Sequence, residues 1–317
     1  MFRGFIAGDS ADKFMYVEDV RLVKGCSAAE LLRMMGRMGG FMGAHLAEAY
    51  QLLRDVLSDR ECLRMVSFTG NLVATGLRGV LVEMLRRKWF DLVFTTCGAV
   101  DHDIARTRSR YRIGSFDADD WELAEKNIHR LGNVYIDQQS YGLVVEREVA
   151  ELVGELGHGA ELPVYEVLWR VGEKLGSENS WLYWCHRHKV PVMVPGIFDG
   201  AFGYQLWLRG KIRLSYEKDQ NLLNEVMWSS RRKAGLIIGG GISKHHLLWW
   251  SQFGGEGLEA AVYISTADEY DGSLSGARPR EAVTWHKISS KARHVFVKTD
   301  ATVALPILVL ALLEELE

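Results

Sequence analysis

Short apolar runs alternate with longer stretches of helical periodicity along most of the chain. The runs lie at 63–68, 92–95, 134–136, 190–194, 236–238, 261–264 and 295–297. Helical patterns lie between them at 72–88, 120–130, 164–175 and 221–232. Strands of this length separated by helices are typical of βαβ units, whose strands form a parallel sheet. We therefore expect an α/β fold with a mostly parallel sheet and helices on both faces.

The two ends of the chain differ from this central pattern. Residues 28–57 have helical periodicity interrupted by glycines, which predicts two helices or one helix with close neighbours. The run 301–313 is the most apolar, but it is too short to span a bilayer and contains Pro306, so we expect a buried terminal helix. Residues 1–27 are polar and predict an N-terminal extension of unknown role. Nothing in 28–317 resembles a linker, so these residues are expected to form one domain with helical N-terminal additions.

Charge and cysteine content exclude several classes of protein. The chain carries 38 Lys and Arg against 41 Asp and Glu, a net charge of −3, so it lacks the basic excess that a nucleic-acid binder needs. The four cysteines form no CxxC pair, which argues against a zinc or redox motif and favours a reducing compartment. We find neither a signal peptide nor a membrane-spanning run, so we expect a soluble cytoplasmic protein that does not bind a membrane.

Glycine is over-represented, at 32 of 317 residues against a typical value of about 7%. Much of the excess follows the predicted strands, in the segments 69–71, 96–103, 195–200, 239–246 and 265–273. Parallel sheets bind ligands at the carboxyl ends of their strands. We therefore expect the functional site at this edge of the sheet.

Two motifs at this edge are compatible with a structural or a functional role. The glycines 239–241 precede a helical pattern and would let backbone N–H groups face a pyrophosphate, although GxGxxG spacing is absent and a tight turn is the alternative. His245 and His246 follow directly. Adjacent histidines on a helix point in different directions and cannot share one metal, so we expect no metal site. One packed and one exposed histidine is the simplest arrangement, and a histidine that donates to a ligand is the functional alternative. The tryptophan pairs 181/184 and 249/250 are expected in core or interface packing.

The segment 271–279 is dense in small polar residues, and a surface loop is its simplest interpretation. The residues that follow favour chemistry, because Glu281, Trp285 and Lys287 combine a carboxylate, an indole and an amine. Such a group can hold an organic cation by charge and cation–π contact. In a dry site it can also lower the pKa of the lysine enough for imine chemistry.

These residues belong to a string that resembles the deoxyhypusine synthase family. The strongest match runs from 239 to 301 and contains GGGISKHH, AVYISTADEYDGSLSGARPREAVTWHKI and VKTDAT. Supporting segments are FTGNLVATGLRG, TTCGAVDHDI, RLGN and PGIFDGAFG. The resemblance covers the chain from about residue 28 to its C-terminus, and the string DGSxSGARPxEAVxWxK is long and specific.

The resemblance implies a Rossmann-like NAD-binding fold and a homotetramer with active sites between paired subunits. It also implies a two-stage reaction, in which NAD+ oxidises spermidine at its secondary amine. The aminobutyl group then passes through an enzyme–lysine imine to a lysine of a translation factor of the 5A type. The implied catalytic residues are Lys287, which forms the imine, His245 near nicotinamide and amine, and Glu281, with Trp285 binding substrate. The implied NAD contacts are Asn71, Thr75, Thr95, Thr96, Gly98, Asp199, Gly240, Thr266, Ala267, Asp271, Gly272, Ser273, Ser275, Asp300 and Ala301.

At the substrate end, five positions depart from the family's pattern. Tyr204 stands where the family has a carboxylate that holds a polyamine nitrogen, and Leu274 replaces the second acid of DGSDSG. Asp101 and His102 stand where two glutamates are usual, and Trp249 stands at an amide position. Loss of two anchoring acids would weaken the binding of a polycation by about 1–3 kcal/mol each.

Three functions follow from this pattern. Deoxyhypusine synthesis is the expected one. Tyr204 and Leu274 motivate an alternative enzyme, similar to homospermidine synthase, that passes the group to a small amine such as putrescine or uses another donor. The third is a catalytically inactive paralogue that serves as a subunit or binding module, and the intact residues Lys287, His245, Glu281 and Trp285 argue against it.

Overall fold

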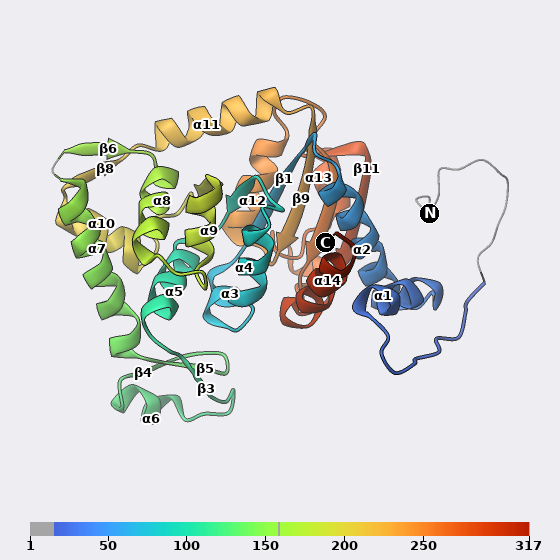
Figure 1. Cartoon of the computed structure of the whole chain (residues 1–317), viewed down its shortest axis with the longest axis horizontal. Coiled ribbons are helices and arrows are strands. Elements are labelled where there is room, and N and C mark those ends of the chain that lie inside the picture. The colour runs from blue at the N-terminus through green and yellow to red at the C-terminus, as the bar shows by residue number, and fades with distance from the viewer. Residues whose placement is uncertain (1–15, 158, 317) are drawn as a thin grey trace.

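The computed structural model describes residues 16–157 and 159–316 and is built around a six-stranded parallel sheet (Figure 1). When the six strands are numbered by their order in the chain and read from β7, their order is 3-2-1-4-5-6, as in dinucleotide-binding folds. The chain adds strands on one side of β1 first and then continues on the other side with β9, so the order switches between β1 and β9. This confirms the expected α/β fold with a mostly parallel sheet. In spatial order the strands are β11 (Ile288–Val297), β10 (Leu258–Ile264), β9 (Arg232–Ile238), β1 (Cys62–Phe68), β2 (Leu92–Phe94) and β7 (Val192–Met193).

Alternate residues of the central strands face two hydrophobic layers, as the period of a strand requires. In β1, Val66 and Phe68 join one core cluster and Met65 joins the other. The first layer includes α2 (Phe41–Ser58) and α14 (Ala301–Leu316), and the second includes α11 (Tyr216–Ser229), α12 (Gly241–Ser251) and α13 (Pro279–Thr284). The C-terminal apolar run is therefore a buried helix, as predicted. Within residues 16–157 and 159–316, no helix has both the length and the apolar character to cross a membrane.

The N-terminal helical pattern forms two helices, α1 (Ala28–Arg37) and α2. A capping box begins α1, because the Ser27 hydroxyl accepts from the Glu30 N–H while the Glu30 carboxylate accepts from the Ser27 N–H. Between the two helices Gly39 has φ 67, a left-handed conformation that suits glycine. The first fifteen residues of the predicted extension lie outside the described residues, and residues 16–27 are neither helix nor strand.

The expected helix 72–88 is two helices, α3 (Gly70–Ala74) and α4 (Arg78–Arg86). The Thr75 hydroxyl donates to the Leu72 carbonyl at 2.8 Å and accepts from the Leu77 N–H at 3.2 Å. These bonds close the end of α3 and compete with continued helix. The single-helix prediction was therefore wrong at this turn.

The expected helix 120–130 is also wrong in its second half. α6 (Asp120–Glu125) is followed by β4 (Ile128–Leu131), which pairs antiparallel with β5 (Val134–Asp137), and β3 (Arg112–Ile113) pairs with the other edge of β5. A two-residue turn, Gly132 with φ 58 followed by Asn133, joins the hairpin. The run 134–136 therefore lies in a small projecting lobe and not in the parallel sheet (Figure 1).

The remaining elements connect or flank the parallel strands. The helix predicted at 164–175 is present, and the one predicted at 221–232 starts and ends earlier, as α11. The other elements are α5 (Cys97–Arg108), α7 (Gly142–Leu156), α8 (Val164–Leu175), α9 (Trp181–His188), α10 (Ala201–Arg209), and the paired strands β6 (Ala160–Leu162) and β8 (Ile212–Leu214).

Candidate functional site

The loops at the carboxyl ends of β1 and β9 touch where the strand order reverses. A Cβ at Gly239, directly after β9, would lie 3.2 Å from the hydroxyl oxygen of Thr69, directly after β1. α5 and α12 begin at the same edge, and within the described residues no side chain caps either N-terminus. Their free N–H groups and positive dipole ends provide a favourable environment for an anionic group.

Close backbone contacts join the glycine-rich loops into one surface. A Cβ at Gly240 would lie 2.5 Å from the Cα of Ser275, in the loop after β10. A Cβ at Gly70 would lie 2.7 Å from the carbonyl carbon of Gly98. The Ser265 hydroxyl also donates to the Ser275 carbonyl at 3.3 Å. Glycine is therefore needed at these positions because backbone meets backbone.

The residues expected to contact NAD lie along this edge, but several of their side chains form hydrogen bonds within the protein. Thr95 is fully buried and donates to the Phe68 carbonyl at 2.8 Å, and Thr75 closes α3. Asp271 accepts from the Ser273 N–H at 2.6 Å, and Asp300 accepts from the Thr302 N–H at 2.8 Å. Exposed are Asn71, Asp199, Thr266, Asp271, Gly272, Ser273 and Asp300; partly buried are Thr96, Gly98, Ala267 and Ser275; buried are Gly240 and Ala301.

α13 leads from the loop after β10 back toward the start of β11, on the sheet face that it shares with α12. It ends in a Schellman motif, in which the N–H groups of His286 and Lys287 donate to the carbonyls of Val283 and Ala282, at 3.0 Å each. His286 takes the left-handed position, with φ 56. Lys287 is half-buried, and its Nζ lies 5.5 Å from the centre of the Trp285 ring, within cation–π range.

The two adjacent histidines divide as the sequence predicts, one packed and one exposed. His246 packs edge-on against Phe94, with ring centroids 5.7 Å apart. His245 is exposed and stacks on Trp249, with ring centroids 6.4 Å apart. Partial burial and the positive charge of Lys287 lower the pKa of His245, so its imidazole is neutral at pH 7. Lys287 and His245 therefore interact electrostatically although they lie on different segments.

Lys244 is a buried residue that sequence reasoning missed. Its ammonium donates to the carbonyls of Leu274 and Ala277, at 2.7 Å each. Glu281, exposed in the first turn of α13, acts electrostatically on Lys244, where its charge opposes the fall in pKa caused by burial. The sequence signal is a lysine directly before His245, on the side of α12 that turns toward the sheet.

The side chains of Asp101 and His102 are occupied within the protein. Asp101 is fully buried and accepts from the N–H groups of Ala201 at 2.9 Å and Phe202 at 2.8 Å, which begin α10. It also accepts from the Tyr141 hydroxyl at 2.9 Å. His102 shares a hydrogen bond of 2.9 Å with the Tyr111 hydroxyl, and burial lowers its pKa to about 4.

The three remaining substrate-end residues belong to separate elements. Tyr204 on α10 is 52% exposed and Trp249 on α12 is 46% exposed. Leu274 is partly buried in the loop after β10. Because Asp101 fixes the first turn of α10, it also fixes the position of Tyr204 one turn further along.

The tryptophan pairs divide between core and surface. Trp181 is fully buried against Phe68, with ring centroids 5.3 Å apart, and Trp250 is also buried. Trp249 is exposed, and Trp184 is partly buried with its indole N–H donating to the Glu178 carbonyl at 2.9 Å. Core packing therefore describes one member of each pair.

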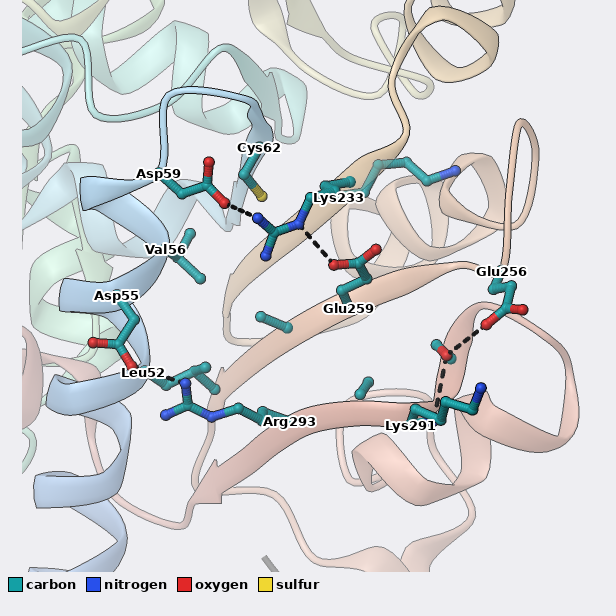
Figure 2. Close-up of a pocket in the computed structure, with 14 residues that line it drawn as sticks. Leu52, Asp55, Val56, Asp59, Cys62, Lys233, Glu256, Glu259, Lys291 and Arg293 are labelled. Carbon is teal, nitrogen blue, oxygen red and sulfur yellow. Dashed lines mark hydrogen bonds and ion pairs between the residues drawn. The ribbon is translucent and has the colours of Figure 1, made fainter. Parts of the chain in front are cut away.

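A charged pocket of about 350 Å³ lies at the opposite edge of the sheet, where β1 and β9 begin (Figure 2). Its two arginines pair with acids: Arg232 binds Asp59 and Glu259, and Arg293 binds Asp55 at 2.8 Å. These matched charges join α2 to the strand starts. These ion pairs give the charged residues of the pocket a structural role. The candidate functional site therefore remains at the glycine-rich edge and on the α12/α13 face.

The family model, the similar sequences and the similar structure described next all carry the same family name. The model of the deoxyhypusine synthase family matches residues 30–312. The protein named "Probable deoxyhypusine synthase" in Ignicoccus hospitalis is 50% identical over 301 residues, which cover 92% of this chain and 93% of the relative. The protein of the same name in Pyrobaculum calidifontis is 50% identical over 294 residues, covering 89% and 98%. A crystal structure from Entamoeba histolytica that carries the deoxyhypusine synthase name matches with a TM-score of 0.64 at 18% identity, over 94% of this chain and 97% of that chain, and supports the fold.

Proposed function

Because the chain belongs to the deoxyhypusine synthase family, we propose that it transfers the aminobutyl group of spermidine to a lysine of a translation factor, with NAD as cofactor. The chain is an enzyme, a transferase of that family. The observation that carries the residue assignment is the grouping of Lys287, Trp285 and His245 on the α12/α13 face of the sheet. The 28–317 segment would form the single catalytic domain.

The strand-end edge fits a dinucleotide such as NAD. The uncapped N-termini of α5 and α12 offer backbone N–H groups and positive dipole ends to a pyrophosphate. Gly240 lacks a side chain where one would meet Ser275, so the loops after β9 and β10 can pack against each other where α12 begins. Asp271 and Ser273 are exposed on the next loop and offer polar groups to a ribose. When bound, NAD supplies the acceptor for the hydride that leaves the amine and is later returned.

The protein residues have complementary roles in this proposal. Hydride loss leaves an iminium cation, which the faces of Trp285 and the carboxylate of Glu281 stabilise as charge develops. Lys287 attacks the iminium carbon through its neutral amine, propane-1,3-diamine leaves, and an imine to the aminobutyl group remains on Nζ. The neutral imidazole of His245 is the nearby group able to take up the released proton.

The decisive test is substitution of Lys287. We expect Lys287→Ala to abolish transfer of label from radiolabelled spermidine while NAD+ binding persists, because the imine cannot form. Lys291→Ala removes an exposed lysine four positions further on and is the matched control, expected to keep full transfer. Borohydride should trap labelled wild-type enzyme before the acceptor is added. Transfer that survives in Lys287→Ala would overturn the assigned role.

A second candidate function changes the donor or acceptor within the same chemistry. Its basis is the aromatic Tyr204 and the aliphatic Leu274, together with Asp101, whose oxygens are engaged by α10 and Tyr141. The same assay, run with a panel of di- and polyamines and with or without the translation factor, separates the candidates. Label on the factor supports deoxyhypusine synthesis, and label on a small amine supports the homospermidine-synthase-like reaction. No NADH formation with any amine would contradict both and favour the inactive paralogue.

We propose three further properties on the same basis. The enzyme would act in the cytoplasm, where its protein acceptor is made. It would form a homotetramer with active sites between paired subunits. The exposed side chains of Tyr204 and Trp207 on α10 would then be covered by a neighbouring subunit or by the acceptor.

A further inference from the structure

Lys244 places a buried ammonium between α12 and the loop after β10. The residue is 1% exposed. Its Nζ lies 4.5 Å from the centre of the Tyr263 ring and donates to the carbonyls of Leu274 and Ala277, at 2.7 Å each. An ammonium is costly to bury unless its three N–H groups find acceptors, and two carbonyls and an aromatic face provide them here.

The segment that Lys244 holds is irregular backbone between η2 (Glu269–Asp271) and α13. Local turns shape it, since the N–H groups of Gly276 and Ala277 donate to the Ser273 carbonyl at 3.2 and 3.3 Å. Such turns fix the curvature of a loop but not its position over the sheet. Lys244 fixes the position of the segment, because its two hydrogen bonds tie residues on either side of Ser275 to α12. This helix begins directly after Gly240, which contacts Ser275.

We propose that Lys244 is a positioning residue for the cofactor, whose buried ammonium holds the 273–277 segment against α12 so that Ser273 and Ser275 face the dinucleotide. This inference rests on the proposed function in one respect, the assignment of that loop to NAD. Adjacent residues of α12 would then have different roles. His245 faces the reacting groups, and Lys244 fixes the loop that receives the cofactor.

Lys233 offers a matched control. It is 0% exposed on β9, and its Nζ also donates to a loop carbonyl, that of Phe253. It lies at the other end of the sheet, where its side chain runs away from Glu259 (Figure 2). Lys233→Met and Lys244→Met remove the same group from equally buried sites, so both should lower stability. Only Lys244→Met should change the glycine-rich edge.

The experiment uses the full chain and two readouts. NAD+ titration, followed by tryptophan fluorescence, should give a Kd raised at least about tenfold in Lys244→Met and unchanged within about twofold in Lys233→Met. At saturating NAD+, kcat for transfer should stay within about threefold of wild type, because Lys287 and His245 are untouched. Amide hydrogen exchange without NAD+ should accelerate at residues 273–278 in Lys244→Met, and not in Lys233→Met.

The possible outcomes are distinct. Wild-type NAD+ affinity in Lys244→Met, or unchanged exchange at 273–278, would overturn the proposal. If the wild-type chain bound no NAD+, the proposed cofactor would be wrong, and the exchange measurement would still decide whether Lys244 holds the loop. If Lys244→Met does not fold, Lys244→Gln keeps one donor group and should give a smaller change in the same direction in both readouts.

Discussion

His246 is a single residue whose burial has a measurable cost at acid pH. Burial, with a smaller contribution from His245, lowers its pKa from 6.5 to about 4, so the unfolded chain binds a proton near pH 5 that the folded chain rejects. The free energy of unfolding therefore falls as the pH drops from 7 to 5, by about 2 kcal/mol from this residue.

Substitution of His246 by phenylalanine tests this directly. The ring packing against Phe94 is kept and the titrating group is removed. Urea unfolding at pH 7 and pH 5 should show a loss of stability about 2 kcal/mol smaller in His246→Phe than in the wild type. His129→Phe, at an exposed histidine, is the control for the substitution of histidine by phenylalanine itself. Equal losses in His246→Phe and wild type would contradict the argument.

At the scale of elements, the residue that ends α13 has a backbone conformation that lowers the stability of the fold, and it directly precedes the candidate catalytic lysine. His286 occupies the left-handed position of a Schellman motif, where glycine is usual and a side chain costs about 1 kcal/mol. His286→Gly should therefore raise the free energy of unfolding by about that amount, with transfer activity kept, as measured by denaturant unfolding. Ser290→Gly, in the following strand, should be destabilising. A destabilised His286→Gly would show that the imidazole makes a stabilising contact of its own.

The sequence predicted elements where local signals were strong and missed them where a single turn decides the outcome. α8 is found at its predicted bounds because its apolar spacing is uninterrupted. The β4–β5 hairpin was predicted only in its second strand, at 134–136, because the helical pattern of 120–130 extends into β4. The break between α3 and α4 depends on one hydroxyl, that of Thr75, whose bonds exist only in the folded backbone.

At the scale of the whole molecule, a cofactor that binds only the folded chain must stabilise all of it. NAD+ at a hundred times its Kd should raise the free energy of unfolding by about 2.7 kcal/mol. Thermal unfolding over a range of NAD+ concentrations would measure this as a midpoint that rises with concentration. Sodium chloride at matched ionic strength is the control for a non-specific effect of added salt. A midpoint independent of NAD+ would argue against a cofactor site at the glycine-rich edge.

The candidate site was predictable in its residues more than in its arrangement. The motifs predict roles for Lys287, Trp285 and His245, but their proximity depends on α12 and α13 covering the same face of the sheet. Asp101 looked available for substrate from its place after a strand, yet it is buried under α10. Lys244 was missed because the feature that distinguishes it, two carbonyl acceptors thirty or more residues away, is tertiary.

The switch in strand order between β1 and β9 also determines how the sheet can form while the chain is being synthesised. β1 pairs with β2 soon after synthesis, but its other edge waits for a partner that begins at Arg232, opposite Cys62. Pairings this distant in sequence form slowly, because a long loop must close first. The emerging chain therefore exposes an unpaired apolar strand until about three-quarters of it has left the ribosome, and the cofactor edge is assembled last.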